Sequence, residues 1–306
     1  MKLLRSLFVF CSIAIALGGS SLAGSEGGSL KWRGCGISKA AFMEACAEQY
    51  AKETGVEIQL SGGGATLGIE AAGTGGADLG GTCRAPQASL NEERPGLKLA
   101  VVAWDALVAA VHPSNEVENI TTDQLKQVLQ QKITNWKELG GPDARIFVVA
   151  RRGKISGVGY STRLLIMGNP DADYGETVVR LNSSGPVEKF VEKTPGAIAI
   201  TGISSAKRRE LKLLKIDGHA PTVKDIASGA YPYYRPLYVA FKSGLDSRTD
   251  EFVEWLLSDR GQGVIEEQGT VTLAQGALLA KRYEHFGDTS LIVNFEALQA
   301  RGQIRQ

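Results

Sequence analysis

The chain has 306 residues, of which 43% are apolar and 22% charged, which excludes a disordered or fibrous protein and allows two ordinary domains. Its formal net charge of +1 excludes a whole-molecule field that would recruit nucleic acid, a polyacid or an anionic membrane surface. Any affinity for an anion must therefore come from a local site, and no nucleic-acid partner is expected.

Residues 1–23 are predicted to be a signal peptide. A basic start precedes an apolar run from Leu7 to Leu17, and Ser21, Leu22 and Ala23 form the small-x-small pattern of a cleavage site. The run is shorter than the roughly 20 apolar residues that span a bilayer, which disfavours a membrane anchor. We expect cleavage and a periplasmic mature protein.

Cysteine and histidine spacing indicates no metal site and no cofactor. Export leaves Cys35, Cys46 and Cys83, and an odd number of thiols in an oxidising compartment suggests one bridge and one free cysteine. None of them forms a Cys-x-x-Cys pair or a cluster with histidine. The three histidines are scattered, so we expect surface residues rather than catalytic bases.

From Leu30, short apolar runs alternate with helical periods, which predicts parallel strands crossed by helices. In chain order the first half predicts a strand in 30–36, a helix that begins at Ser38 and ends at Gly55, a strand in 56–60, a glycine-rich loop and short helix in 61–76, and a strand in 77–81. Loops at the carboxyl ends of such strands gather where the strand order reverses, and ligands bind there. We expect the three glycine-bearing loops to converge.

The apolar run 97–113 is too long for one strand and lacks helix caps, so it is predicted to leave one domain and enter another. A Thr-x-x-Gln capping box at Thr121 then predicts a helix. Further strands are expected in 144–150, 195–201 and 211–216, with a return crossing in 234–242. Two crossings between two α/β lobes predict a hinge and a cleft. Lobe 1 would comprise 24–107 and 237–306, and lobe 2 would comprise 108–236.

Each predicted lobe contains a loop suited to an anion. Loop 61–68 places backbone N–H groups at a helix start, where unpaired donors and the helix dipole favour negative charge. Loop 150–162 carries Arg151 and Arg152 ahead of a second helix start at Ser156, and an arginine fork donates two parallel hydrogen bonds to an oxyanion. One such loop in each lobe favours a shared site over two solvated turns.

No catalytic set is recognisable, so we expect no enzyme activity. The segment Ser156 to Gly159 lacks the flanking residues of a nucleophile elbow. A nucleophilic Cys83 acidified by Arg84 remains a rival hypothesis, although no base for it is identifiable.

Four blocks of the chain resemble the periplasmic phosphate-binding proteins of ATP-binding-cassette (ABC) importers. They are 121–141, 183–201, 221–242 and 252–269, and they occur in the order of that family. The similarity covers roughly 32–273 and leaves the role of 274–306 open. It implies an α/β, two-lobed periplasmic-binding-protein fold of type II, with two doubly wound lobes joined by two crossover strands. It also implies a monomeric receptor that presents phosphate or a similar small oxyanion to an inner-membrane ABC permease.

The resemblance implies a ligand site on four loops, three in lobe 1 and an Arg…Ser-Gly-Thr loop in lobe 2. Here Ala65 stands where a serine is usual, Cys83 where an Asp or Ser is expected, and Val158 where a threonine is expected. Carried over residue by residue, the expected ligand residues are Gly36, Ser38, Gly62, Gly63, Gly64, Thr66, Thr82, Cys83, Arg84, Arg151 or Arg152, Ser156 and Gly157.

These departures weaken the expected selectivity for phosphate. Monohydrogen phosphate carries a proton, so selecting it over sulfate calls for an acceptor, and the carboxylate of the family is absent at Cys83. Asp78 could replace it only if its side chain turned into the cleft. Helix N-termini and arginines would still hold a dianion. The alternative is a periplasmic interaction or sensory protein that kept the fold and lost phosphate binding.

If the strand order is 2-1-3, Cys35 and Cys83 lie at the carboxyl ends of adjacent strands, roughly 5 Å apart between Cα atoms. We predict that they form a disulfide that fixes two ligand loops. Two buried free thiols are the alternative.

Overall fold

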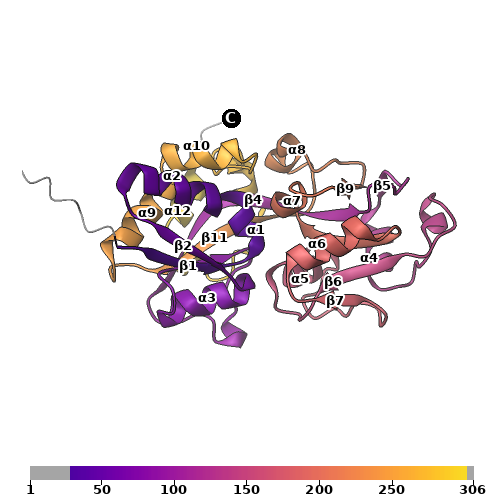
Figure 1. The fold of residues 1–306 in the computed structure, drawn as a ribbon, viewed down its shortest axis with the longest axis horizontal. Coiled ribbons are helices and arrows are strands. Elements are labelled where there is room, and N and C mark those ends of the chain that lie inside the picture. Colours follow the sequence, from indigo (N-terminus) through magenta and orange to yellow (C-terminus); the bar gives the residue numbers. More distant parts are fainter. Residues whose placement is uncertain (1–27, 302–306) are drawn as a thin grey trace, which may run out of the picture.

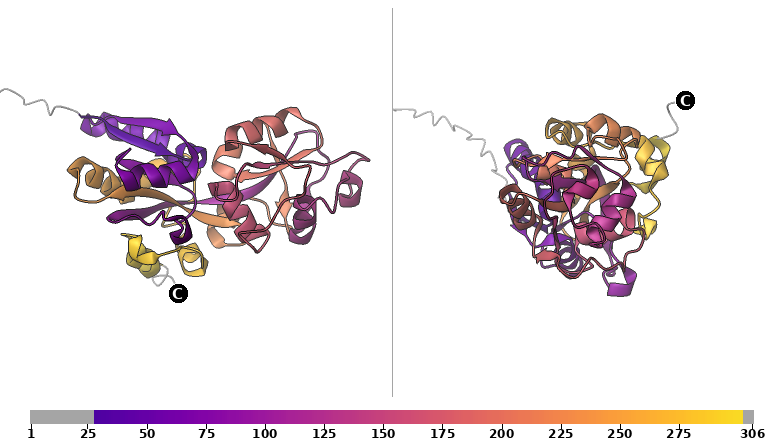
Figure 2. Two further views of the ribbon diagram at one scale, coloured as in Figure 1. Left: turned by 90° about the horizontal axis from the view of Figure 1, so that it is seen from below. Right: turned by 90° about the vertical axis from the view of Figure 1, so that its right-hand side faces the viewer.

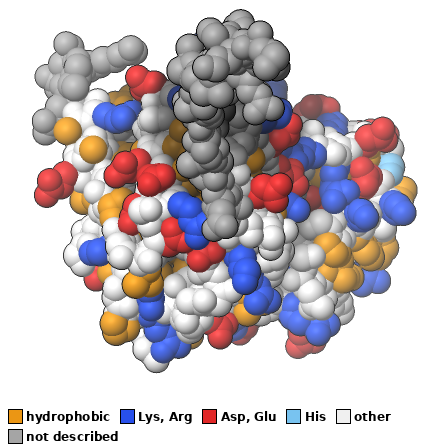
Figure 3. All heavy atoms as spheres, turned by 60° about the vertical axis from the view of Figure 1, so that its left-hand side comes forward, with side chains coloured by type: hydrophobic (Ala, Val, Ile, Leu, Met, Phe, Trp, Pro, Cys, Tyr) orange, Lys and Arg blue, Asp and Glu red, His pale blue; other side chains and the backbone are white. Residues whose placement is uncertain are grey.

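The computed structural model describes residues 28–301, so the predicted signal peptide lies outside the described residues. Two α/β lobes lie side by side (Figure 1). They are joined by two long strands, β4 (Leu97–Val111) and β11 (Tyr234–Lys242). None of the described helices combines the length and the hydropathy needed to cross a membrane. On the face shown in Figure 3, acidic and basic side chains are interspersed.

Lobe 1 is built on a sheet with strand order β2-β1-β3-β11-β4. Its first three strands are parallel, and they are β1 (Leu30–Gly34), β2 (Ile58–Gly62) and β3 (Leu79–Thr82). The predicted order 2-1-3 is therefore confirmed. Helices α2 (Glu44–Thr54), α9 (Ser247–Leu257) and α10 (Asp259–Glu267) cover one face of the sheet, and α3 (Gly64–Thr74) covers the other (Figure 1).

Lobe 2 continues the sheet in the order β4-β8-β6-β7. These strands are β6 (Phe147–Arg151), β7 (Val179–Leu181) and β8 (Ala197–Gly202), while β9 (Lys212–Leu213) pairs with β4 and β10 (Lys215–Ile216) pairs with β5 (Asn119–Ile120). The helices are α4 (Thr122–Leu129), α5 (Gly157–Ser161), α6 (Ser184–Lys193), α7 (Ile203–Ala206) and α8 (Val223–Ser228). Short π-helical or 3₁₀ turns are η2 (Ala88–Leu90), η3 (Trp136–Leu139), η4 (Thr162–Ile166) and η5 (Thr289–Leu291).

The apolar run after residue 96 is one strand, so the expectation that it is too long for a single strand was wrong. Its first part, up to Ala106, pairs with β11, and its last five residues, from Leu107, pair with β8. Every residue of β4 except Lys98 is buried, because each half of the strand is covered on both faces by its own lobe. The strand therefore shows no period-two alternation, which made its length ambiguous in the sequence.

Helix boundaries follow local capping chemistry. The first helical run begins at Gly36, with Cys35 as N-cap, so the N-cap predicted at Ser38 was three residues late. It comprises α1 (Gly36–Ser38), the π-helical turn η1 (Lys39–Met43) and α2, and it ends at Gly55 in the left-handed conformation, as predicted. The capping box at Thr121 is present and opens α4.

The C-terminal segment packs beside lobe 1, close to the crossing strands, and is shown in yellow in Figure 2. It contains α11 (Ala277–Arg282) and α12 (Phe295–Arg301). The side chain of Asn294 donates one hydrogen bond to the backbone of β4 and accepts another. Arg282 donates to the carbonyl oxygen of Ser228 in lobe 2 at 3.1 Å, so this segment contacts both lobes.

Candidate functional site

A cavity of about 270 Å³ lies between the lobes, at the carboxyl ends of β1, β2, β3 and β6. Of the residues expected from the sequence, it is lined by Gly36, Gly62, Gly63, Gly64, Cys83, Arg151 and Gly157. The convergence of the glycine-bearing loops on one place is thereby confirmed. Residues that the sequence reasoning did not select also line the cavity, and they include Asn182, Ser183, Ser184 and Gly185.

Four helices begin at this cavity. The first residues of α1, α3, α5 and α6 are Gly36, Gly64, Gly157 and Ser184, and all four line it. The opening N–H groups of a helix have no partner within the helix, and the helix dipole places partial positive charge there. Four such ends around one cavity form a cradle of donors for an anion. Gly64 has φ +87°, a backbone conformation that only glycine adopts readily.

Arg151 brings a full positive charge to the cavity from the end of β6. An added Cβ at Gly64 would lie 3.6 Å from its Nη2, so the guanidinium reaches across the cleft to the start of α3. Its Nη1 is buried and has no hydrogen-bond partner among the described residues. Burial lowers the pKa of Arg151, which is the direction that desolvation of a cation produces. A desolvated donor that faces a cavity calls for an anionic acceptor.

The cavity floor carries two thiols. Cys35 and Cys83 are 5% and 1% exposed, line the cavity and interact through their side chains. Both are free cysteines in the structure, so the predicted disulfide is not formed there. Cys35 serves instead as the N-cap of α1, where its sulfur accepts a hydrogen bond from the backbone N–H of Ser38 at 3.3 Å.

The two thiols differ in acidity. Burial opposes ionisation of Cys35, but hydrogen bonds with its neighbours and the charge of Arg235 lower the pKa of its thiol to about 6. The hydrogen bond to Cys35, together with burial, raises the pKa of Cys83. A cysteine at a helix N-terminus beside a cation is the environment in which thiolates form.

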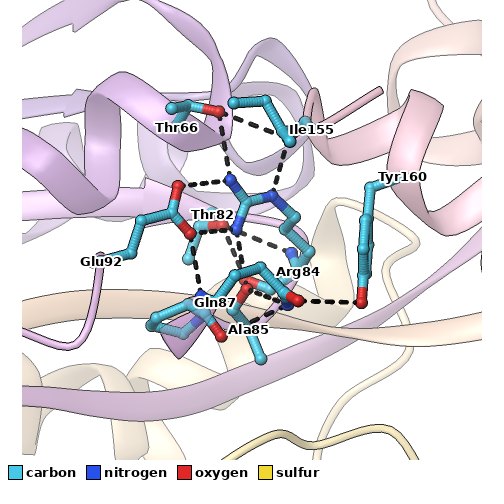
Figure 4. A network of polar contacts seen from close by, with 9 residues as sticks. Thr66, Thr82, Arg84, Ala85, Gln87, Glu92, Ile155 and Tyr160 are labelled. Carbon is cyan, nitrogen blue, oxygen red and sulfur yellow. Dashed lines mark hydrogen bonds and ion pairs between the residues drawn. The ribbon is translucent and has the colours of Figure 1, made fainter. Parts of the chain in front are cut away.

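Arg84 was expected to bind the ligand, but it lies outside the cavity. Its guanidinium donates two hydrogen bonds of 2.6 Å to the carboxylate of Glu92, and its Nε donates to the carbonyl oxygen of Ile155 at 2.8 Å (Figure 4). Its Nη2 also donates to Thr66, which in turn donates to the same carbonyl group. Arg84 and Thr66 therefore form a contact between the lobes, and Glu92 neutralises the cation.

Four further expected residues do not line the cavity, because their side chains serve the backbone or solvent. Ser38 is fully buried against Cys35, and the Oγ of Ser156 caps α5 by accepting from Gly159 N. Thr82 donates to the carbonyl oxygen of Arg84 at 2.8 Å, and Arg152 is exposed. Asp78, the conditional acceptor, accepts from the backbone N–H of Lys31 at 2.7 Å and is likewise absent from the cavity lining.

A buried ion pair lies beneath the thiols at the crossing strands. Arg235 on β11 and Asp105 on β4 are register partners with fully buried side chains, and Nη2 lies 3.2 Å from Oδ2. Arg235 also donates to the carbonyl oxygen of Gly157 and to Ser161. Asp105 accepts from the N–H and hydroxyl groups of Ser204. The pair thus connects both crossing strands to the starts of α5 and α7.

The geometry is that of a two-lobed anion receptor, and comparison with known proteins decides the family. The family model of the PBP superfamily domain matches residues 37–260. The chain belongs to the PBP superfamily. Within the superfamily its two-lobed fold is that of type II periplasmic binding proteins, which confirms the fold class expected from the sequence.

Relatives in the PBP superfamily carry names connected with phosphate. Phosphate-binding protein PstS of Bacillus subtilis (strain 168) is 29% identical over 229 residues, which cover 74% of this chain and 75% of that protein. A Clostridium perfringens protein solved with bound phosphate is similar at 27% identity and a TM-score of 0.72, covering 80% of this chain and 99% of that one. An ABC-type phosphate transport receptor from Vibrio cholerae has 29% identity and a TM-score of 0.63 over the same shares.

Proposed function

We propose that this protein is an exported receptor that binds phosphate or a similar small oxyanion between its lobes and presents it to an ABC permease of the inner membrane. The observation that carries the proposal is the unpaired guanidinium of Arg151, which faces four helix N-termini across a cavity. The names of the relatives and the phosphate bound in one of them support the ligand class. In this proposal the protein is monomeric and periplasmic, needs no cofactor and catalyses no reaction.

The test compares Arg151→Gln with Arg152→Gln by titration calorimetry with phosphate. Loss of this half-buried charge is expected to weaken phosphate binding by about 100-fold, because removing one partner of a desolvated charge contact costs roughly 2–5 kcal/mol. The neighbouring Arg152 is exposed and lies outside the cavity lining, so its variant should bind as the wild type does. Equal effects of both variants, or unchanged binding in both, would contradict the assignment.

A second candidate function is a periplasmic sensory or interaction protein that has lost phosphate binding. One observation favours it: no carboxylate from residues 28–301 lines the cavity, and Asp78 accepts a hydrogen bond from the backbone. A calorimetric panel of phosphate, arsenate, sulfate, molybdate and tungstate distinguishes the two. Binding of at least one oxyanion supports the receptor, whereas the absence of binding to all five oxyanions supports the sensory candidate.

Sulfate affinity is expected to fall as the pH rises through about 6. Sulfate remains a dianion between about pH 5 and 8, so only the protein changes charge. Below the pKa of about 6 the Cys35 thiol is neutral, and above it a thiolate adds negative charge to the cavity wall. The apparent affinity should then fall by up to about tenfold per pH unit, since binding is linked to one proton. Calorimetry of wild type and Cys35→Ser across this range checks it: the variant should show a flat profile, and a flat wild-type profile would contradict the assignment.

A further inference from the structure

The proposed binding of an oxyanion gives no role to the two thiols of the cavity, Cys35 and Cys83. Helix N-termini and Arg151 suffice to hold an oxyanion, yet Cys35 and Cys83, which follow two paired strands, line the same cavity. Sulfur is a poor hydrogen-bond partner compared with a hydroxyl or carboxylate oxygen. It is, however, the preferred ligand of soft, thiophilic elements.

The charge around the pair decides which soft ligand it can take. Arg151 lines the same cavity and four helix N-termini face the same space, whereas the charge of Arg235 is paired with Asp105. This positive surrounding disfavours a soft metal cation such as Cu(I). No cluster of three metal-binding side chains exists among residues 28–301 either. The ligand must therefore be thiophilic but neutral or anionic, and it should carry hydroxyl or oxo groups for the N–H cradle.

We propose that the cavity also binds trivalent arsenic, as arsenous acid, through bonds from both sulfur atoms to arsenic. This inference rests on the proposed oxyanion site. Arsenous acid, As(OH)₃, is neutral at physiological pH and resembles phosphate in size. Its condensation with the Cys35 thiolate and the Cys83 thiol breaks one S–H and two As–O bonds, forms two As–S bonds, takes up one proton from solvent and releases two water molecules. Arsenic remains trivalent, so no oxidant or reductant takes part.

The geometry of the pair suits this product. A pyramidal arsenic atom holds its two sulfur ligands close to each other, and here the two cysteines follow the paired strands β1 and β3 and line the same cavity. Cys35 supplies the nucleophilic sulfur, since it caps α1 and lies beside Arg235. The third hydroxyl group remains on arsenic and faces the donors at the starts of α3 and α6. The second As–S bond forms within one complex, so the pair binds far more tightly than one thiol.

The experiment adds sodium arsenite to the reduced, exported form and follows thiol titration, intact mass and calorimetry. Wild type should bind one arsenic atom and lose two of its titratable thiols. Cys35→Ser and Cys83→Ser should each weaken arsenite binding by about 100-fold or more. Cys46→Ala is the matched control, because Cys46 is buried in α2, does not line the cavity and has its pKa raised to about 12 by burial. It should bind arsenite as the wild type does.

Phosphate titration of the same variants separates this inference from the proposed function. Phosphate uses the N–H cradle and Arg151, so its binding by a serine variant shows that the variant is folded. The thiol site would be overturned if wild type and Cys83→Ser bound arsenite equally, or if both thiols of the wild type stayed titratable after arsenite is added. Neither outcome would contradict the proposed oxyanion receptor. Arsenite binding without any oxyanion binding would instead overturn the receptor.

Discussion

Replacing Gly157 by alanine is expected to weaken phosphate binding by about 100-fold while leaving the protein folded. Gly157 opens α5 in lobe 2 and lies against lobe 1. An added Cβ would lie 2.4 Å from the sulfur of Cys83 and 3.0 Å from the Cβ of Ala65, distances that force the lobes apart. A displacement of about 1 Å at a site that depends on exact positioning costs roughly 100-fold. Calorimetry with phosphate measures the loss, and thermal unfolding verifies the fold.

Two comparisons show whether the methyl group acts through the contact between the lobes. Gly263→Ala is the matched control, since an added Cβ there meets nothing within 4 Å and the residue lies in α10, far from the cavity lining. It should bind phosphate as the wild type does. The double variant Gly157→Ala/Cys83→Ala removes the sulfur that the new methyl group would meet, so part of the affinity should return. Unchanged affinity in Gly157→Ala would show that closure at this contact is not required.

The strands and the glycine loops could be predicted because their signals are local. A short apolar run marks a strand, and a turn with positive φ calls for glycine whatever the rest of the chain does. The capping box at Thr121 and the left-handed Gly55 belong to the same class of signal, and both predictions are confirmed. The fold class followed from the order of such elements together with the family resemblance.

The partners of the charged side chains could not be predicted, because they depend on distant segments. Arg84 resembles a ligand in sequence, yet Glu92 in the following loop and Ile155 in the other lobe occupy its donors. The choice between Arg151 and Arg152 also stayed open in the sequence. Successive residues at a strand end point to opposite faces, and only the tertiary structure shows which face meets the cavity. Here it is Arg151.

The start of α6 was missed although its sequence carries a signal. Ser183 is the N-cap of the amphipathic helix α6, and Ser184 and Gly185 are its first residues, so the three have the composition of a helix start. In the sequence they belong to a block that resembles the family, and the resemblance assigns them no ligand role, so the fourth helix N-terminus was not predicted. For the two thiols, the sequence predicted one feature and missed another. Its proximity could be predicted from strand order, whereas the cap that Cys35 provides for α1 depends on where the helix begins.

Replacing Asp105 by asparagine is expected to lower the stability of the protein by roughly 3–5 kcal/mol, because it leaves the charge of Arg235 buried and uncompensated. Both side chains are 0% exposed, and no other ion pair to Arg235 exists among the described residues. For a protein of this size, the loss corresponds to a decrease in Tm of about 10 °C. Thermal unfolding by circular dichroism measures it. Asp173→Asn is the matched control, since Asp173 is 81% exposed and its ion pair with Lys154 is screened by solvent, so this variant should unfold as the wild type does.

The double variant Asp105→Asn/Arg235→Met shows whether the loss of stability comes from the uncompensated charge of Arg235 or from a general disturbance of the crossing strands. Removing the cation as well should recover much of the lost stability, because replacing both members of a buried pair is often nearly neutral, whereas removing one is not. The recovery should be incomplete, since Gly157 and Ser161 lose the hydrogen bonds that Arg235 donates. Additive losses from the two single variants would mean that Asp105 stabilises the hinge chiefly through Ser204 rather than by neutralising Arg235.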